Sequence, residues 1–169
     1  MYLGDQVGGH GVYDMQSGTL DGWHDTRTVE NDGVSTEVTQ TWYGGIVLGE
    51  WGGYGDFNHS GGTVHIDNLT IARQENSVGH YNLSGDATVT LTVEGQTVVG
   101  ARGSGFFDQT DGTHTTGGLT IGGSGVTVIL DDNTGEYKEH WTNQGQGIYT
   151  LDTSLPDGDS SILWVKGDL

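Results

Sequence analysis

Polar and apolar residues alternate in short runs along this chain, as in Thr88-Val89-Thr90-Leu91-Thr92-Val93. Such alternation is typical of a β-strand with one buried face. No window of useful length places apolar residues at the i, i+3, i+4 and i+7 positions of an amphipathic helix. The 32 glycines and the many threonines and valines also disfavour helices. The pattern therefore predicts an all-β protein whose short strands are joined by turns rich in Gly, Asn and Asp.

A glycine-led motif recurs along the chain: a glycine, any residue, an aromatic residue, two or three more residues, and then Ser or Thr. Its full copies combine Gly11 with Tyr13, Gly55 with Phe57, Gly79 with Tyr81, Gly105 with Phe107, and Gly147 with Tyr149. Two weaker copies begin at Gly33 and Gly125 and lack the aromatic residue. The seven glycines follow one another at steps of 22, 22, 24, 26, 20 and 22 residues. A near-constant step of this size indicates a repeat architecture.

A second series, in which a small residue follows an apolar one, runs in phase with the first. Its members are Leu3-Gly4, Leu48-Gly49, Ile71-Ala72, Val99-Gly100 and Ile121-Gly122. The step is too short for a propeller blade, and the signature of a leucine-rich repeat is absent. We therefore predict that residues 1–169 form one domain, a parallel β-solenoid (β-helix) of about seven coils with about 22–24 residues each. Residues 20–46 and 123–146 depart from the motif and are predicted to be irregular coils.

In such a solenoid like positions stack on like, so the aromatic residues of the motif are predicted to form a stacked column. Histidines are numerous but share no position in the repeat, and we interpret them as scattered surface side chains. They are His10, His24, His59, His65, His80, His114 and His140.

Length, charge and cysteine content narrow the possible functions. The chain has 169 residues, 32% apolar residues and a net charge of −18 with only five basic residues. Nucleic acid is excluded as a partner because phosphate binding needs basic patches. No apolar run reaches transmembrane length, so membrane insertion is not expected. The absence of cysteine removes disulfides and thiolate metal sites.

Both ends carry apolar strand sequences without a polar cap, although solenoids normally need caps to stay soluble. Two explanations remain open: the chain is part of a longer repeat protein, or its ends stack on other copies head to tail. The residues predicted to mediate self-association are Tyr2, Leu3, Ile162, Leu163, Trp164 and Val165.

Candidate ligand and metal residues gather in the irregular parts. Trp23 and His24, together with His140 and Trp141, are candidate ligand contacts. Two acidic turns carry the oxygen ligands that calcium prefers, although neither has EF-hand spacing. The residues of these turns are Asp131, Asp132, Asn133, Asp157 and Asp159. No other cofactor is indicated.

No catalytic motif stands out, because neither a phosphate-binding loop nor a nucleophile elbow is present. The enzymatic alternative is a polysaccharide-cleaving β-helix that uses surface carboxylates. Its candidate residues are Arg73, Arg102, Asp56, Glu75 and Asp108. Ice binding is a third hypothesis, suggested by Thr63, Thr88 and Thr113 and interrupted by Asp21, His65 and Asp152.

The segment Gly100-Ala101-Arg102-Gly103-Ser104-Gly105-Phe106-Phe107-Asp108-Gln109-Thr110-Asp111-Gly112-Thr113, followed by Leu119-Thr120-Ile121-Gly122, resembles the Gly-rich repeats of bacterial secreted and surface proteins. These are the autotransporter-passenger-like and PEP-CTERM-associated repeats, and the similarity is best over residues 47–122. The resemblance implies an extracellular or cell-surface β-solenoid with a structural, adhesive or matrix role. We therefore expect a non-catalytic, self-assembling module whose partners are other copies, polysaccharide or cell-surface components. Carbohydrate binding or cleavage is the alternative.

Overall fold

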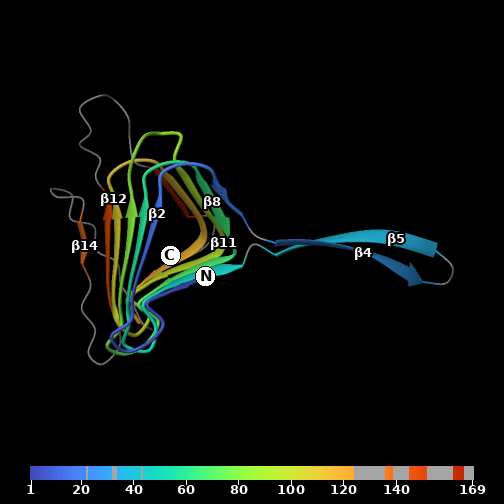
Figure 1. Cartoon of the computed structure of the whole chain (residues 1–169). Helices are drawn as coiled ribbons and strands as arrows, with labels where there is room; N and C mark the ends of the chain where they lie inside the picture. Colours follow the sequence, from blue (N-terminus) through green and yellow to red (C-terminus); the bar gives the residue numbers. More distant parts are fainter. Residues whose placement is uncertain are drawn as a thin grey trace.

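The computed structural model describes residues 1–21, 23–31, 34–42, 44–123, 136–138, 145–151 and 162–165. These residues contain strands and no helix, so the predicted all-β class is confirmed. Most strands belong to two curled sheets, and a two-stranded sheet stands apart from them (Figure 1).

Sheet A has eight strands. They are β1 (Tyr2–Leu3), β3 (Thr19–Leu20), β6 (Gly45–Leu48), β8 (Thr63–Ile66), β9 (Asn68–Ile71), β11 (Thr90–Val99), β13 (Thr113–Ile121) and β16 (Ile162–Val165). Sheet B has six strands. They are β2 (His10–Met15), β7 (Tyr54–His59), β10 (Val78–Leu83), β12 (Ser104–Gln109), β14 (Glu136–Lys138) and β15 (Gln146–Leu151).

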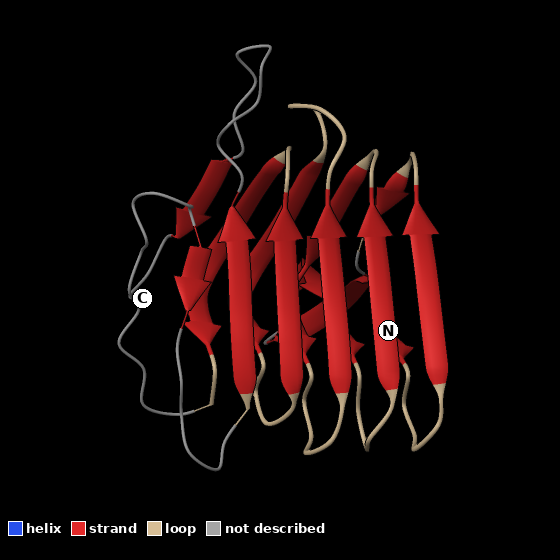
Figure 2. Cartoon of the chain, turned by 90° about the vertical axis from the view of Figure 1, so that its left-hand side faces the viewer, coloured by secondary structure: helices blue, strands red, loops and turns tan. Residues whose placement is uncertain are grey.

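Strands from successive copies of the motif pair in parallel in sheet B, where β2, β7, β10, β12 and β15 lie side by side (Figure 2). The register aligns the five full copies residue by residue. It brings together Gly11, Gly55, Gly79, Gly105 and Gly147 in one row, and Tyr13, Phe57, Tyr81, Phe107 and Tyr149 in another. Consecutive rings of the second row have centroids 4.5–5.0 Å apart, so the predicted aromatic column is present.

Sheet A contains two rows of parallel strands. The long strands β11 and β13 belong to both rows and join them into one sheet. Row 1 runs through β3, β8, the first halves of β11 and β13, and β16. Row 2 runs through β1, β6, β9 and the second halves of β11 and β13. The core lies between sheets A and B and consists of the aromatic column and the inward aliphatic residues of sheet A.

The two sequence series share one spacing because they pack against each other. A Cβ atom added to Gly105 would lie 2.2 Å from the backbone nitrogen of Gly100, and one added to Gly147 would lie 2.5 Å from that of Gly122. The small residues of the second series all have positive φ angles, from 57° at Ala72 to 84° at Gly122. Such angles favour glycine, which explains the small residue after each apolar one.

Residues 20–46, where an irregular coil was predicted, contain a two-stranded sheet in their described part. Strands β4 (Trp23–Asn31) and β5 (Val34–Trp42) pair antiparallel with each other and form a separate hairpin. Figure 1 shows this hairpin extending away from the two sheets. Gly33, Gly125 and most of residues 123–146 lie outside the described residues, and β14 pairs antiparallel with β15. The structure therefore aligns five copies of the motif, and seven coils are not confirmed.

Candidate functional site

The N-terminal end of the two sheets is open. Within the described residues, β1 pairs only with β6, β2 only with β7, and β3 only with β8. Each of these three strands therefore presents backbone N–H and C=O groups without a partner strand on one side, which is the usual template for strand addition. We call β1, β2 and β3 together the N-terminal edge.

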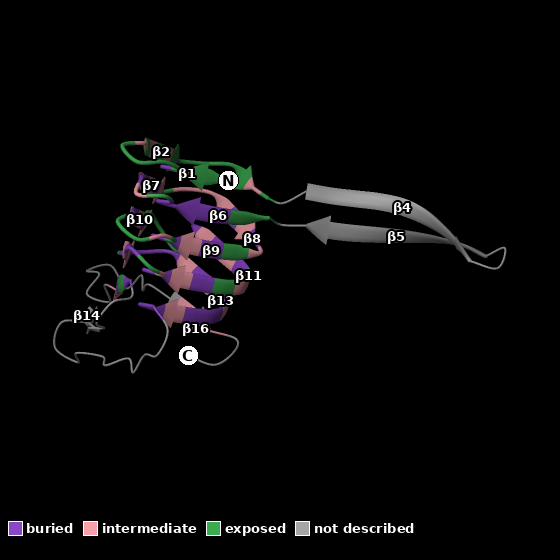
Figure 3. Ribbon diagram, turned by 90° about the horizontal axis from the view of Figure 1, so that it is seen from below, coloured by how far each residue is buried: buried purple, intermediate pink, exposed green. Residues whose placement is uncertain are grey.

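The core is also uncovered at the N-terminal edge. Leu3, Tyr13 and Leu20 are only partly buried, whereas their partners in the next strands, Leu48, Phe57 and Val64, are fully buried. Figure 3 shows the change from exposed residues in β1 to buried residues in β6. Among the residues whose side chains are described, the exposed large hydrophobic ones are Met1, Tyr2, Val7, Val12 and Trp51, and four of these five belong to the first twelve residues.

The structure places the predicted self-association residues at opposite ends of sheet A. Tyr2 and Leu3 form β1, at the end of row 2, whereas Ile162–Val165 form β16, at the end of row 1. The two sets therefore do not face each other directly if one copy stacks on another. In row 1 the strand opposite β16 is β3. In sheet B the outer side of β15 is already occupied by β14.

The side chains of the other predicted site residues lie outside the described part of the chain. Trp23 and His24 lie in β4, for which only the backbone is described, and His140 and Trp141 lie outside the described residues. The predicted calcium residues Asp131, Asp132, Asn133, Asp157 and Asp159 also lie outside the described residues. In the part of the chain that is described, no group of three or more His, Cys, Asp or Glu residues is placed to hold a metal ion. The same part contains no helix of the length and apolarity needed to cross a membrane.

Among the described histidines, His59 and His114 are buried, which corrects the interpretation of the histidines as surface side chains. His114 stacks on Phe107 at 4.9 Å, with Nδ1 3.0 Å from the Tyr149 hydroxyl and Nε2 3.1 Å from Thr97 Oγ1. His59 Nδ1 lies 3.0 Å from the hydroxyl of Tyr81. Burial lowers the pKa of His114 to about 3 and also lowers the pKa of His59. Both imidazoles are therefore neutral core residues that satisfy the tyrosine hydroxyls of the aromatic column.

The free energy of unfolding is expected to decrease as the pH is lowered, because of these histidines. An unfolded histidine binds a proton near pH 6.5, whereas buried His114 does not until about pH 3. Between these values the unfolded state holds the extra proton, so acid favours unfolding by about 1.4 kcal/mol per pH unit for His114. We expect the urea concentration at the unfolding midpoint to be lower at pH 5.0 than at pH 7.5, and we expect this difference to be smaller in His114→Gln. His80→Gln, on the outer face of sheet B, is the control, and an equal pH dependence in all three proteins would contradict the prediction.

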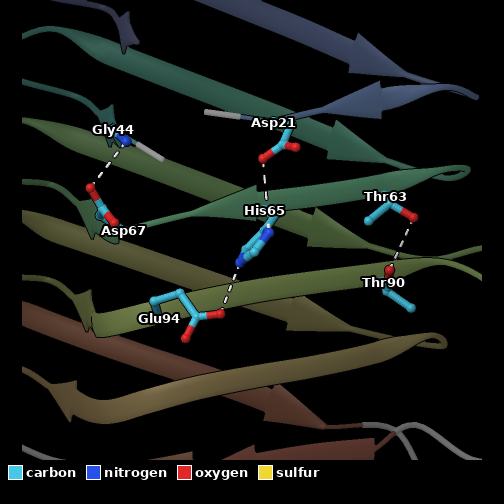
Figure 4. A network of polar contacts seen from close by, with 7 residues as sticks. All are labelled: Asp21, Gly44, Thr63, His65, Asp67, Thr90 and Glu94. Carbon is cyan, nitrogen blue, oxygen red and sulfur yellow. Dashed lines mark hydrogen bonds and ion pairs between the residues drawn. The ribbon is translucent and has the colours of Figure 1, made fainter. Parts of the chain in front are cut away.

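A polar network ties both ends of the hairpin to sheet A (Figure 4). Before the hairpin, Asp21 Oδ1 lies 3.8 Å from His65 Nδ1, and His65 Nε2 lies 2.8 Å from Glu94 Oε1. After the hairpin, the Gly44 backbone N–H donates to Asp67 Oδ2 at 3.1 Å, and the Asp67 N–H donates to the Gly44 carbonyl at 2.7 Å. Residues of β8 and of the β8–β9 connection therefore hold the base of the hairpin.

The same face contains the threonines that suggested ice binding. Thr19, Thr63, Thr90 and Thr113 align in row 1, so Thr90 takes the place that the sequence assigned to Thr88. Thr90 donates to Thr63 at 3.2 Å. The residues two positions further along the strands include Asp21 and His65, which interrupt the array.

The carboxylates proposed for polysaccharide cleavage are dispersed. Glu75 pairs with Arg102 at 3.0 Å, and the buried Glu50 pairs with Arg73 at 3.1 Å. Asp56 and Asp108 lie on sheet B, two strands apart and two residues out of register. Strand spacings place them roughly 12 Å apart, which exceeds the separation of paired acids in glycosidases.

Comparison with known proteins identifies no relative: no protein-family model, no curated protein and no solved structure matches the chain. Function is therefore inferred from the chain's own geometry.

Proposed function

We propose that this chain is a non-catalytic, extracellular structural module, a short parallel β-solenoid of about five coils that self-associates through its N-terminal edge. The parallel alignment of the five full motif copies supports the solenoid. The charge of −18 and the resemblance to Gly-rich surface repeats support an extracellular or cell-surface location. Calcium binding by the acidic turns, which lie outside the described residues, belongs to the same proposal.

The open N-terminal edge is the observation that carries the proposal. Both sheets end there in strands that are paired on one side only, beside partly buried core residues and the exposed Tyr2 and Val12. Adding strands would satisfy the backbone groups and bury apolar surface. The partner is a second copy or a further repeat segment of a longer parent chain.

Head-to-tail stacking fits the strand directions. In row 1, β16 of one copy would pair in parallel with β3 of the next. In sheet B, β14 is antiparallel to β15 and would therefore meet β2 of the next copy as an antiparallel pair. A contact of this heterologous kind does not close and propagates into a filament.

Charge placed at the N-terminal edge is expected to abolish self-association. We expect the wild-type chain to sediment as concentration-dependent oligomers and the double variant Tyr2→Lys/Val12→Lys to sediment as a monomer, because lysine on an edge strand opposes strand addition. The matched control is Ala87→Lys/Thr88→Lys, which adds the same charge at two exposed turn residues between β10 and β11. The readout is sedimentation velocity, with negative-stain microscopy to separate filaments from closed dimers.

A wild-type chain that stays monomeric at all concentrations would refute self-association. Equal oligomerisation in the two double variants would show that the N-terminal edge is not the contact. Closed dimers would refute head-to-tail stacking.

A further inference from the structure

A groove crosses the turns that connect sheet A to sheet B. These turns occupy residues 4–9, 49–53, 72–77 and 100–103 and are stacked on one another by backbone hydrogen bonds, such as Glu50 N–H to the Gly4 carbonyl and Arg73 N–H to the Gly49 carbonyl. The groove has a volume of about 320 Å³, at the lower end of the range for small-ligand sites. Its lining includes Val7, Trp51, Gln74, Glu75, Asn76 and Arg102, drawn from all four turns.

The exposure and the backbone conformation of Trp51 are not explained by a role in folding. Its side chain is 60% exposed, and its φ angle is +49°, which is unusual for a bulky residue. An exposed indole contributes little to the core, and the left-handed backbone adds strain. Strained residues that the surrounding structure maintains cluster at binding sites. Trp51 therefore has the features of a contact residue.

The polar groups around Trp51 favour a neutral ligand. Glu75 and Arg102 lie 3.0 Å apart and balance each other's charge, while Gln74 and Asn76 contribute uncharged amides. An anionic ligand would be repelled by a chain of net charge −18. The groove thus combines the flat apolar indole of Trp51 with the planar amides of Gln74 and Asn76, which both donate and accept hydrogen bonds.

A pyranose ring has the complementary chemistry, because it has an apolar face of C–H groups and a rim of hydroxyls. We propose that this groove binds a short stretch of a neutral polysaccharide, with a sugar ring stacked on Trp51 and its hydroxyls hydrogen-bonded by Gln74, Asn76 and the Glu75–Arg102 pair. This binding activity is separate from self-association at the N-terminal edge.

Affinity gel electrophoresis tests this proposal with the intact chain. The gels contain hydroxyethyl cellulose, galactomannan or dextran as neutral polymers, and polygalacturonate as the anionic comparison. We expect at least one neutral polymer to retard the wild-type chain and polygalacturonate to have no effect. Trp51→Asn should bind at least ten-fold more weakly. Phe106→Asn is the matched control, because it removes a partly exposed ring from the outer face of sheet B and should bind like wild type.

The stability of Trp51→Asn separates binding from a structural role. Asparagine tolerates positive φ angles, so its urea midpoint should equal or exceed that of wild type although binding is lost. The proposal is overturned if no neutral polymer retards the wild-type chain, if Trp51→Asn is retarded equally, or if it is clearly less stable than wild type. Retardation by polygalacturonate alone would also overturn it.

Discussion

Phe107→Ala is expected to lower the free energy of unfolding by about 3–5 kcal/mol, the range for removing a buried phenylalanine. Phe107 is a fully buried member of the aromatic column, between Tyr81 and Tyr149. Its ring stacks on Tyr81 at 5.0 Å, on Tyr149 at 4.5 Å and on His114 at 4.9 Å. Alanine would leave a cavity that three rings, each stacked on further neighbours, cannot close by small movements. Urea unfolding followed by circular dichroism measures the loss.

Phe106→Ala is the control for this prediction. Phe106 is the adjacent residue of β12, points to the opposite face of sheet B, and stacks at 4.5 Å on His80 while staying partly exposed. Its removal is expected to cost about 1 kcal/mol, since little buried area and one aromatic pair are lost. Equal decreases in the free energy of unfolding in the two variants would show that the aromatic column does not make a larger contribution to stability than the outer face of sheet B.

Gly105→Ala is expected to destabilise the chain by about 3 kcal/mol or more, because overpacking against backbone cannot relax through a side-chain rotation. The new Cβ atom would lie 2.2 Å from the nitrogen and 2.7 Å from the Cα of Gly100. Sheets A and B would have to separate at this point, which weakens the adjacent aromatic contacts. The same urea measurement, together with the loss of near-ultraviolet dichroism, reports the change.

Gly18→Ala is the matched control for the glycine prediction. Gly18 has a φ angle of +88°, but a Cβ atom there would meet nothing within 4 Å. Its replacement therefore carries only the backbone strain of a left-handed alanine, about 1–2 kcal/mol. Equal losses in Gly18→Ala and Gly105→Ala would show that the close approach of Gly105 to Gly100 does not add to the cost of the alanine side chain.

The candidate sites were only partly visible in the sequence. Tyr2 and Leu3 were predicted as self-association residues, and the structure places them in a strand that pairs with β6. Trp51 was not singled out, since an exposed tryptophan and a buried one have the same local pattern. Its positive φ angle is visible only in the structure. The groove is completed by Val7, Gln74 and Arg102, which lie 44, 23 and 51 residues away from Trp51 in the chain. The burial of His114 was missed for a similar reason, because Tyr149 and Thr97 reach it from other strands.

The hairpin is the element that the spacing of the repeat glycines did not predict. Gly11 and Gly55 are 44 residues apart, which is twice the repeat step, so the spacing predicted an extra coil beginning at Gly33. The intervening residues instead form β4 and β5, with Asn31 paired to Val34. Asp32-Gly33 between them is a dipeptide typical of two-residue hairpin turns, and this signal favoured the hairpin.

Sequence alone determined the all-β class and the identity of the aromatic column, because parallel in-register strands place like residues on like. The common spacing of the two series also follows from their mutual packing at each turn. Only the tertiary structure decided which strands stack in parallel and which fold back on themselves, since both kinds alternate with a period of two residues. It also decided which histidines are buried and where the N-terminal edge and the Trp51 groove lie, because these depend on contacts between segments far apart in the chain.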